Sequence, residues 1–181
     1  MQIIECADAV EWEHWLAANH ERVGEVWVRI AKKGSGRASV TSAEALDGAL
    51  CVGWIDSHRR GGDAEHYLQR YSPRRARSPW SAVNVAKAEA LIAAGRMRAA
   101  GFAAIEAARA DGRWEAAYPA QRSGEIHPEL VAALDGDPAA RARFDALGRS
   151  ARYGFSLRVT KARSAAGRAN QVRKVLAELA A

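Results

Sequence analysis

The sequence predicts an α+β fold, in which a small antiparallel sheet of about three strands packs with helices and a helical C-terminal half follows. Three observations lead to this prediction. Apolar and polar residues alternate in short segments before Pro79, which is typical of strands with one buried face. After Pro79 the apolar residues recur at helical spacing, between glycine and proline stops. Finally, 181 residues with 49% hydrophobic side chains suffice for a globular core.

The first predicted elements are a helix, a strand and a turn. Asp8 can cap the first helix, because its carboxylate accepts hydrogen bonds from unsatisfied backbone N–H groups. The segment EVWVRIAKK then alternates and predicts a strand that buries Val26, Val28 and Ile30. The glycines of Gly34-Ser-Gly36 predict a turn that ends this strand. The segment is too short for a glycine-rich phosphate-binding motif.

A capping box and a hairpin complete the N-terminal part, residues 1–80. Thr41 and Glu44 can each satisfy a backbone N–H group at the start of a second helix. This helix runs to Gly53, and Cys51 within it is expected to be buried as a small hydrophobic residue. The segments WIDSHRR and HYLQRYS predict the second and third strands. The turn RGGDAE between them is longer than a two-residue hairpin turn, so the pairing register stays open.

In the C-terminal half, residues 81–181, the spacing of apolar residues predicts helices. We expect these helices to form one compact unit with the N-terminal part. Ser78 or Ser81 can cap the first of these helices, and Gly95 ends it. A loop is predicted at 119–127. The apolar residues of the final helix recur at i, i+3, i+4 and i+7 and are expected to face the core: Val172, Val175, Leu176 and Leu179.

The positive charge of the chain is unevenly distributed. The net charge is +6, and arginine outnumbers lysine 22 to 5. Residues 1–64 hold 7 basic and 10 acidic side chains, whereas residues 65–181 hold 20 basic and 11 acidic ones. The basic half can attract phosphates, nucleic acid or anionic lipid. The alternative is compositional drift, because abundant arginine and alanine are usual in proteins of GC-rich genomes.

The spacing of cysteines and histidines argues against a metal or redox site. Cys6 and Cys51 belong to no CxxC pair, and the five histidines form no HxxxH or HxH pair. We therefore expect no metal and no cofactor, and a reducing cytoplasm fits best as the compartment. The first residues lack a basic start and an uninterrupted apolar run, so we expect no signal peptide. No apolar run is long enough to predict a membrane span.

Several segments resemble those of a known family. The segment ALCVGWIDS is similar to the family's ALxxGWIDG, and LQRYSPRRARSPWSAVNVAKAEALIAAGRM is similar to its QRFTPRRxxSxWSxxNxxKAExLIxxGRM. The segments ADGRWEAAY and KARSAAGRANQVRKVL extend the likeness, which covers most of residues 10–176. On these residues the chain resembles the YdeI/OmpD-associated family, also called bacteriocin-protection proteins. The resemblance implies a role in stress or in tolerance of antimicrobial peptides, and it brings no reaction or cofactor with it.

The segment QRYSPRRARSPWS, residues 69–81, is the first candidate binding surface. Pro73 and Pro79 stiffen it, so it loses less entropy when it holds a ligand. Its arginines offer planar forks that match carboxylate or phosphate, and the flanking indoles could wall a pocket. In the alternative, the arginines point into water while the aromatic rings pack in the core. The expected ligand contacts are Trp54, Asp56, His58, Arg70, Arg74, Arg75, Trp80 and Asn84.

The second candidate is the pair Asp56 and His58. By alternation these two side chains share one strand face with Trp54, so Asp56 could orient the imidazole for acid–base work. No nucleophile with a recognisable setting accompanies them. In the alternative, which we favour, Asp56 forms a structural ion pair with an arginine such as Arg70 on the neighbouring strand.

The third candidate is the basic segment 146–177, which contains no acidic residue. It could form a face for nucleic acid or anionic lipid, although no helix-turn-helix, RRM or zinc-finger signature supports one. We favour the alternative of a solvated face. The basic side chains are Arg149, Arg152, Arg158, Lys161, Arg163, Arg168, Arg173 and Lys174.

The residue features predict a cytoplasmic protein that binds an anionic small molecule or a protein partner and catalyses no reaction, and the family resemblance implies that its role is in stress or resistance. In this interpretation Arg70, Arg74 and Arg75 hold the anion, and Asp56 orders the arginines. One alternative is a nucleic-acid-binding regulator that uses the basic C-terminal half. A second alternative is an enzyme centred on Asp56 and His58. The natural ligand and the oligomeric state stay open.

Overall fold

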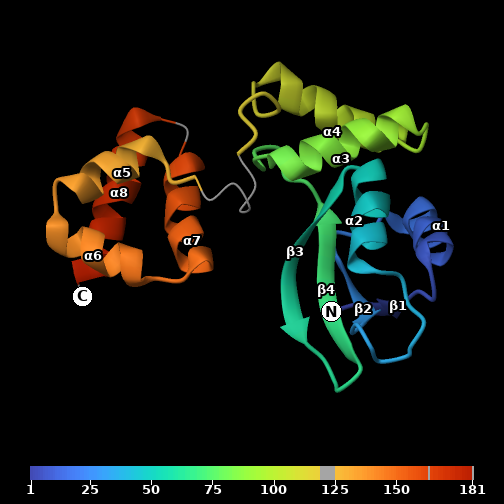
Figure 1. The fold of residues 1–181 in the computed structure, drawn as a ribbon. Helices are drawn as coiled ribbons and strands as arrows, with labels where there is room; N and C mark the ends of the chain where they lie inside the picture. Colours follow the sequence, from blue (N-terminus) through green and yellow to red (C-terminus); the bar gives the residue numbers. More distant parts are fainter. Residues whose placement is uncertain (119–124, 163, 181) are drawn as a thin grey trace. The chain divides into compact units, whose positions relative to one another are not determined.

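The chain forms two compact units in the computed structural model, which describes residues 1–118, 125–162 and 164–180. The first, the sheet unit, comprises Met1–Ser78 and Asn84–Glu115, and the second, the helical unit, comprises Pro79–Val83 and Ala116–Ala181. The sheet unit mixes strands and helices, whereas the helical unit consists of helices joined by short connections (Figure 1). The predicted α+β class with a helical C-terminal half is therefore confirmed.

The sheet has four strands in the order β1-β2-β4-β3. Strand β1 (Ile3–Glu5) pairs in parallel with β2 (Val26–Ala31). Antiparallel pairs join β2 to β4 (His66–Pro73) and β4 to β3 (Trp54–Gly61). The prediction of about three strands was one short, because three residues are too few to show an alternating pattern.

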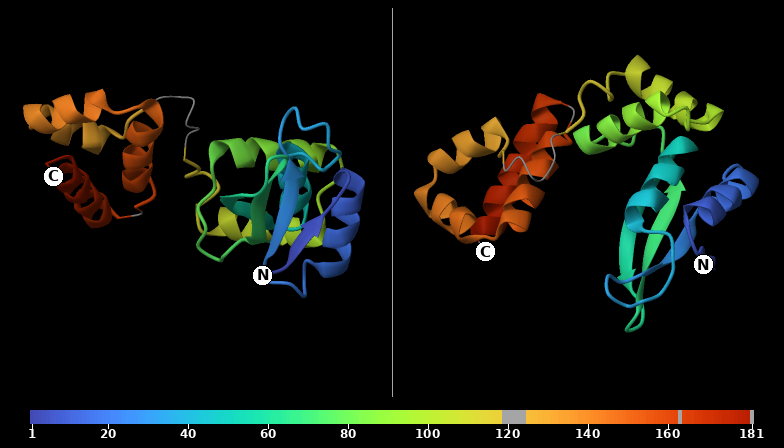
Figure 2. Two further views of the ribbon diagram at one scale, coloured as in Figure 1. Left: turned by 90° about the horizontal axis from the view of Figure 1, so that it is seen from below. Right: turned by 45° about the vertical axis from the view of Figure 1, so that its right-hand side comes forward.

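One face of the sheet carries the core of the sheet unit. Helix α1 (Ala9–Asn19) contributes Trp12 and Leu16 to this core. Helix α2 (Ser42–Cys51) contributes Ala45 and Ala49 to the same cluster, opposite the inward residues of β2. Figure 2 shows both helices beside the sheet. The inward residues predicted for β2 are all at most 1% exposed: Val26, Val28 and Ile30.

The local signals in the sequence form as predicted. The side chain of Asp8 accepts a hydrogen bond of 2.9 Å from the backbone N–H of Glu11. Both halves of the capping box between Thr41 and Glu44 are present at the start of α2. Gly95 has a positive φ of 66° beyond the end of helix α3 (Ala82–Ala93), a conformation that glycine adopts without strain.

Helix α4 (Ala99–Ala110) packs closely against the end of α2. Helices α3 and α4 lie beyond the end of the sheet at which β3 begins and β4 ends (Figures 1 and 2). At Gly53, an added Cβ would lie 2.8 Å from the carbonyl oxygen of Ala100, so only glycine fits there. Most of α3, and all of α4, therefore group with the sheet and not with the helices that follow.

In the described part of the helical unit, four helices pack around a core of their own. These are α5 (Pro128–Asp135), α6 (Pro138–Ala146), α7 (Arg149–Thr160) and α8 (Ala165–Ala180). The stripe predicted for the last helix is largely confirmed, since three of its residues are buried and Leu176 is partly buried. Of the predicted loop at 119–127, residues 119–124 lie outside the described residues. None of the described helices combines the length and apolarity that a membrane span requires.

Candidate functional site

A β-bulge in the β3–β4 hairpin decides which of the predicted site residues share a face. Asp56 pairs with Tyr71, but the next paired residue of β3 is Arg59, opposite Gln69. One extra residue is thereby inserted into β3. Paired residues of antiparallel strands project to the same face, so Arg59 joins Asp56 on the face of Gln69. The simple alternation that grouped Asp56 with His58 is interrupted at this point.

Arg59 is held in place by two side chains of β4. Its Nε donates a hydrogen bond of 3.1 Å to the Oε1 atom of Gln69. Its guanidinium carbon lies 4.4 Å from the centre of the Tyr67 ring, within cation–π range. Gln69 is only 3% exposed, and its Nε2 donates to the carbonyl of His58 at 3.2 Å. The guanidinium of Arg59 is thus oriented by the strand, and its remaining N–H groups can serve a ligand.

The carboxyl group of Asp56 lies within the electrostatic reach of Arg59 and Arg74. Desolvation raises the pKa of Asp56 above the usual range of a carboxyl group, while a hydrogen bond to its own backbone and the two arginines act in the opposite direction. Asp56 as a whole is exposed, so the desolvation of its carboxyl group is only partial. Burial, and then the charge of Asp56, also raise the pKa of the Tyr71 hydroxyl.

Arg70 and Arg74 lie in different surroundings, although both were expected to hold the anion. Arg70 lies opposite Trp27 in the register and forms an ion pair with Glu25. It therefore projects from the other face of the sheet than Gln69 does. The sequence analysis favoured an ion pair between Asp56 and an arginine such as Arg70, but Arg70 pairs with Glu25 instead. Arg74 follows the end of β4, where its backbone N–H donates to the carbonyl of Gly53 at 3.0 Å.

The next two arginines lie in an exposed turn. The backbone N–H of Ser78 donates to the carbonyl of Arg75 at 2.9 Å and closes the turn. The side chains of Arg75 and Arg77 are exposed. Within the part of the chain that the structure describes, neither forms an ion pair. Their guanidinium groups are therefore open to an external anion.

Trp54 and Trp80, whose indoles were expected to form the walls of a ligand pocket, are both buried. Trp54 is 1% exposed, and its Nε1 donates to the carbonyl of His20 at 3.2 Å. Trp80 is 2% exposed and belongs to the segment of the helical unit that includes residues 79–83. Asn84 is half-buried in the first turn of α3. The burial of both indoles agrees with the core-packing alternative, so we do not include either ring among the ligand contacts.

Asp56 and His58 are not joined in a catalytic arrangement. His58 is exposed, and among the described residues no hydrogen bond or ion pair links its side chain to Asp56. An acid–base pair needs the two side chains within hydrogen-bond reach of each other. The geometry therefore gives no support to an enzyme centred on this pair. The described residues also contain no group of three or more side chains placed to hold a metal ion.

Some of the basic side chains of segment 146–177 are neutralised by acids from outside it. Arg158 donates two hydrogen bonds, of 2.8 and 2.7 Å, to the carboxylate of Glu178. Arg168 Nε donates to Glu129 at 2.6 Å. Arg163 lies outside the described residues. These pairs reduce the positive potential of the segment and favour the solvated-face interpretation over a nucleic-acid surface.

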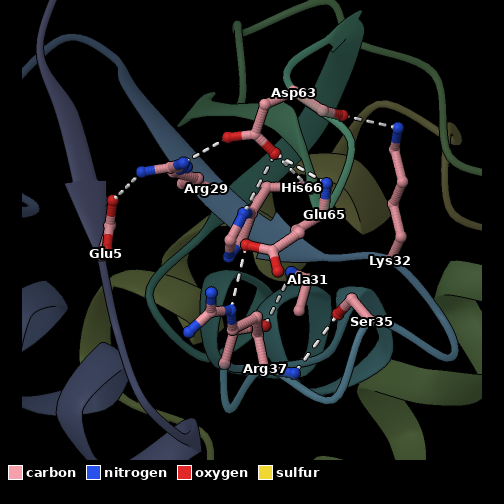
Figure 3. Close-up of polar contacts among 10 residues, drawn as sticks. Glu5, Arg29, Ala31, Lys32, Ser35, Arg37, Asp63, Glu65 and His66 are labelled. Carbon is pink, nitrogen blue, oxygen red and sulfur yellow. Dashed lines mark hydrogen bonds and ion pairs between the residues drawn. The ribbon is translucent and has the colours of Figure 1, made fainter.

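A polar network at the tip of the β3–β4 hairpin has a structural role (Figure 3). Arg29 forms ion pairs with Glu5, at 2.5 Å, and with Asp63. The carboxylate of Asp63 also accepts the backbone N–H groups of Glu65 and His66 at 2.8 and 2.7 Å. Arg29, followed by these backbone groups, holds the pKa of Asp63 well below its usual range. The network closes the turn between the two strands.

The sequence did not reveal the residues that orient the site. Arg59, Gln69 and Tyr67 form its ordered part, and none of them was among the expected ligand contacts. The available signal was Gln69, a polar residue flanked by aromatic positions on one strand face. The bulge that brings Arg59 to this face leaves no mark in the alternation pattern. We call Asp56, Arg59, Arg74, Arg75 and Arg77 the arginine site.

Comparison with known families agrees with the division into two parts. Residues 4–104, more than half of the chain, match the model of a domain of unknown function (DUF8412). Residues 123–181 match the model described as bacteriocin-protection, YdeI or OmpD-associated. No curated protein and no solved structure matches the chain. The chain therefore belongs to the DUF8412 family, which its residues 4–104 match, and its residues 123–181 are similar to the YdeI or OmpD-associated bacteriocin-protection family.

Proposed function

We propose that the protein binds an anionic group at the arginine site and contributes in this way to bacteriocin protection or to a related stress response. The anionic group is a carboxylate or phosphate on a small molecule or a protein partner. The protein acts as a binding protein and not as an enzyme. This proposal keeps the anion binding that the sequence predicts, together with Arg74 and Arg75, and replaces Arg70 and the two indoles by Arg59 and Arg77.

The observation that carries the proposal is the orientation of Arg59 beside Asp56 and Arg74. The guanidinium of Arg59 is fixed by Gln69 and by the ring of Tyr67. A side chain that is already ordered loses less entropy when it binds a ligand. Charge-assisted hydrogen bonds to carboxylate or phosphate are about twice as strong as neutral ones. A pre-ordered arginine next to further arginines is therefore a suitable anion site.

The exposed turn that directly follows Arg74 adds further positive charge. Arg75 and Arg77 add two guanidinium groups that no described acidic side chain neutralises. Asp56 offsets part of this positive charge, because its carboxylate interacts electrostatically with Arg59 and Arg74. A site of this composition is suited to a group with more than one negative charge. Pyrophosphate and citrate are therefore useful probe anions.

Isothermal titration of the whole chain with pyrophosphate and with citrate at low ionic strength tests the proposal. The double variant Arg74→Ala, Arg75→Ala should weaken binding at least about tenfold, since each charged hydrogen bond contributes roughly 1.5–3 kcal/mol. The charge-matched control is Arg22→Ala with Lys33→Ala, because both side chains are exposed in the same unit. The control should keep the wild-type affinity.

Two outcomes would contradict the proposal. Equal binding by the wild type and the double variant, at unchanged melting temperature, would show that the arginine site does not hold the anion. A similar loss in the control variant would show that only net charge matters. Binding to mixed-sequence DNA or RNA that falls steeply with salt would instead favour the nucleic-acid alternative. In cells, survival under bacteriocin challenge should fall with the double variant and not with its control.

A further inference from the structure

We propose a second ligand site in the sheet unit, a cleft that takes a monocarboxylate with an apolar tail. The cleft has a volume of about 420 Å³. It is bordered by helix α1, by the end of helix α2 and by the start of helix α4, all of them in the sheet unit. No residue of the arginine site lines it, so it is separate from the anion site proposed above.

The walls of the cleft are mostly apolar and are formed by small side chains. Leu16 and Ala17 come from α1, Val52 follows α2, and Ala99 and Ala100 begin α4. Pockets that bind small molecules have volumes of roughly 300–1,000 Å³ and combine apolar walls with a few polar groups. The volume and lining of this cleft fit that description. An apolar tail of several methylene groups would be favourably removed from water there.

Small residues keep the space open. Gly48 lines the cleft from α2, where an added Cβ would lie 2.9 Å from the Cδ1 atom of Trp12. A larger side chain at this position would therefore have to displace the buried indole of Trp12. Ala17, Ala99 and Ala100 carry only a methyl group each and cannot fill the volume. The cleft is thus a consequence of close helix packing around a row of short side chains.

The charged side chains of the lining are Glu13, Glu21, Arg96 and Arg98, so the position of each one decides where an anionic head group fits. Glu21 lies 3.9 Å from the ring of His20, another lining residue, so we place the head group at the α4 end of the cleft. Arg96 is already neutralised, because it forms an ion pair of 2.6 Å with Glu13. Arg98 lines the same cleft and is exposed, and within the described residues no acidic side chain pairs with it. A carboxylate at Arg98 would complete a second ion pair at the rim, while its tail lies along Leu16 and Ala17.

The backbone beside Arg98 also favours a negatively charged head group at this end of the cleft. Arg98 is the N-cap residue of α4, and its side chain does not cap the first N–H groups of that helix. The residues that follow, Ala99 and Ala100, belong to the cleft lining. The first turn of a helix carries partial positive charge and adds to the attraction that the guanidinium group exerts. The rim at this end therefore favours a carboxylate over an uncharged head.

Titration with three probes separates the contributions of tail and head. Octanoate has both features, octanol lacks the charge, and acetate lacks the tail. We expect saturable binding of octanoate by isothermal titration calorimetry, with octanol and acetate each weaker by about tenfold or more. Equal binding of octanol and octanoate would overturn the assignment of the head group to Arg98. An octanoate titration without saturation would overturn the site itself.

Two variants with matched controls locate the binding. Ala17→Phe should block the cleft, because Ala17 is exposed and lines it, whereas Ala18→Phe places the same ring on an exposed position of α1 outside the lining. Arg98→Ala should weaken octanoate about tenfold and leave octanol unchanged, and Arg22→Ala should change neither. Octanoate binding that survives both Ala17→Phe and Arg98→Ala would refute the proposal. The pyrophosphate titration above tests different residues, so either proposal can fail without the other.

Discussion

The contact between helices α2 and α4 can be tested by a single methyl group at Gly101. An added Cβ at Gly101 would overlap the sulfur of Met97 and the carbonyl oxygen of Cys51, and it would lie 2.9 Å from the carbonyl carbon of Cys51. The sulfur is part of a flexible side chain and can move. The carbonyl is backbone and already accepts the N–H of Arg98 at 3.0 Å, so it cannot move without separating the two helices.

The expected magnitude follows from two opposing contributions. Replacing a glycine of a helix by alanine, here in the first turn of α4, stabilises the helix by up to about 1 kcal/mol, because alanine loses less backbone entropy. Overpacking a close contact typically costs about 1–3 kcal/mol, and an overlap with backbone lies toward the upper end of that range. Gly101→Ala should therefore lower the free energy of unfolding of the sheet unit by about 1–2 kcal/mol.

A matched substitution in the other unit should have the opposite sign. Gly154 lies within α7, and nothing lies within 4 Å of an added Cβ there. Gly154→Ala should stabilise the helical unit by roughly 0.5–1 kcal/mol through helix propensity alone. The two variants make the same chemical change, so only the surroundings of the methyl group differ.

Denaturant unfolding monitored by two probes distinguishes the units. Five of the six tryptophans belong to the sheet unit, so fluorescence reports mainly on that unit, whereas far-UV circular dichroism reports on the helices of both. The midpoint of the fluorescence transition should fall for Gly101→Ala and stay unchanged for Gly154→Ala. A neutral or stabilising effect of Gly101→Ala would refute the close approach of α2 and α4.

Two further predictions concern pH and the second core. The pKa of Asp63 is held below its unfolded value by Arg29 and by two backbone N–H groups, so its contribution to stability is present above about pH 4 and is lost as pH falls toward the lower folded pKa. Asp63→Asn should therefore lower stability at pH 7 and flatten the acid limb of a plot of melting temperature against pH, and an unchanged acid limb would contradict this reasoning. Leu134 is 1% exposed in the core of the helical unit, so Leu134→Ala should destabilise that unit by about 2–5 kcal/mol. Leu176→Ala should cost less, because Leu176 is only partly buried, and equal losses in circular dichroism melts would contradict the packing described here.

The predictions that succeeded rest on interactions between residues close together in the chain. The capping box of Thr41 and Glu44 spans one helical turn, and Asp8 caps α1 over a similar distance. The strands at WIDSHRR and HYLQRYS were also placed correctly, since each carries its own pattern of alternation. Such signals depend on local geometry and can be read without knowledge of the fold.

The candidate site was only partly predictable for the same reason. Arg74 and Arg75 were singled out by a local run of basic residues. Arg59 was missed, because its place beside Asp56 depends on a bulge that exists only once β3 pairs with β4. Trp54 was expected to contact a ligand, but it lies in the core. Its indole Nε1 donates a hydrogen bond of 3.2 Å to the carbonyl of His20, at the end of a helix far earlier in the chain.

The sequence by itself determined the α+β class, the caps of the helices, the strand segments and the abundance of arginine, because each depends on residue type and on near neighbours. Tertiary structure alone decided the parallel strand β1, the ion pair of Arg70 with Glu25 and the cleft between α1, α2 and α4. The physical reason is that these features arise from contacts between segments far apart in the chain. Strand register and close helix packing choose those contacts, and no local pattern records them.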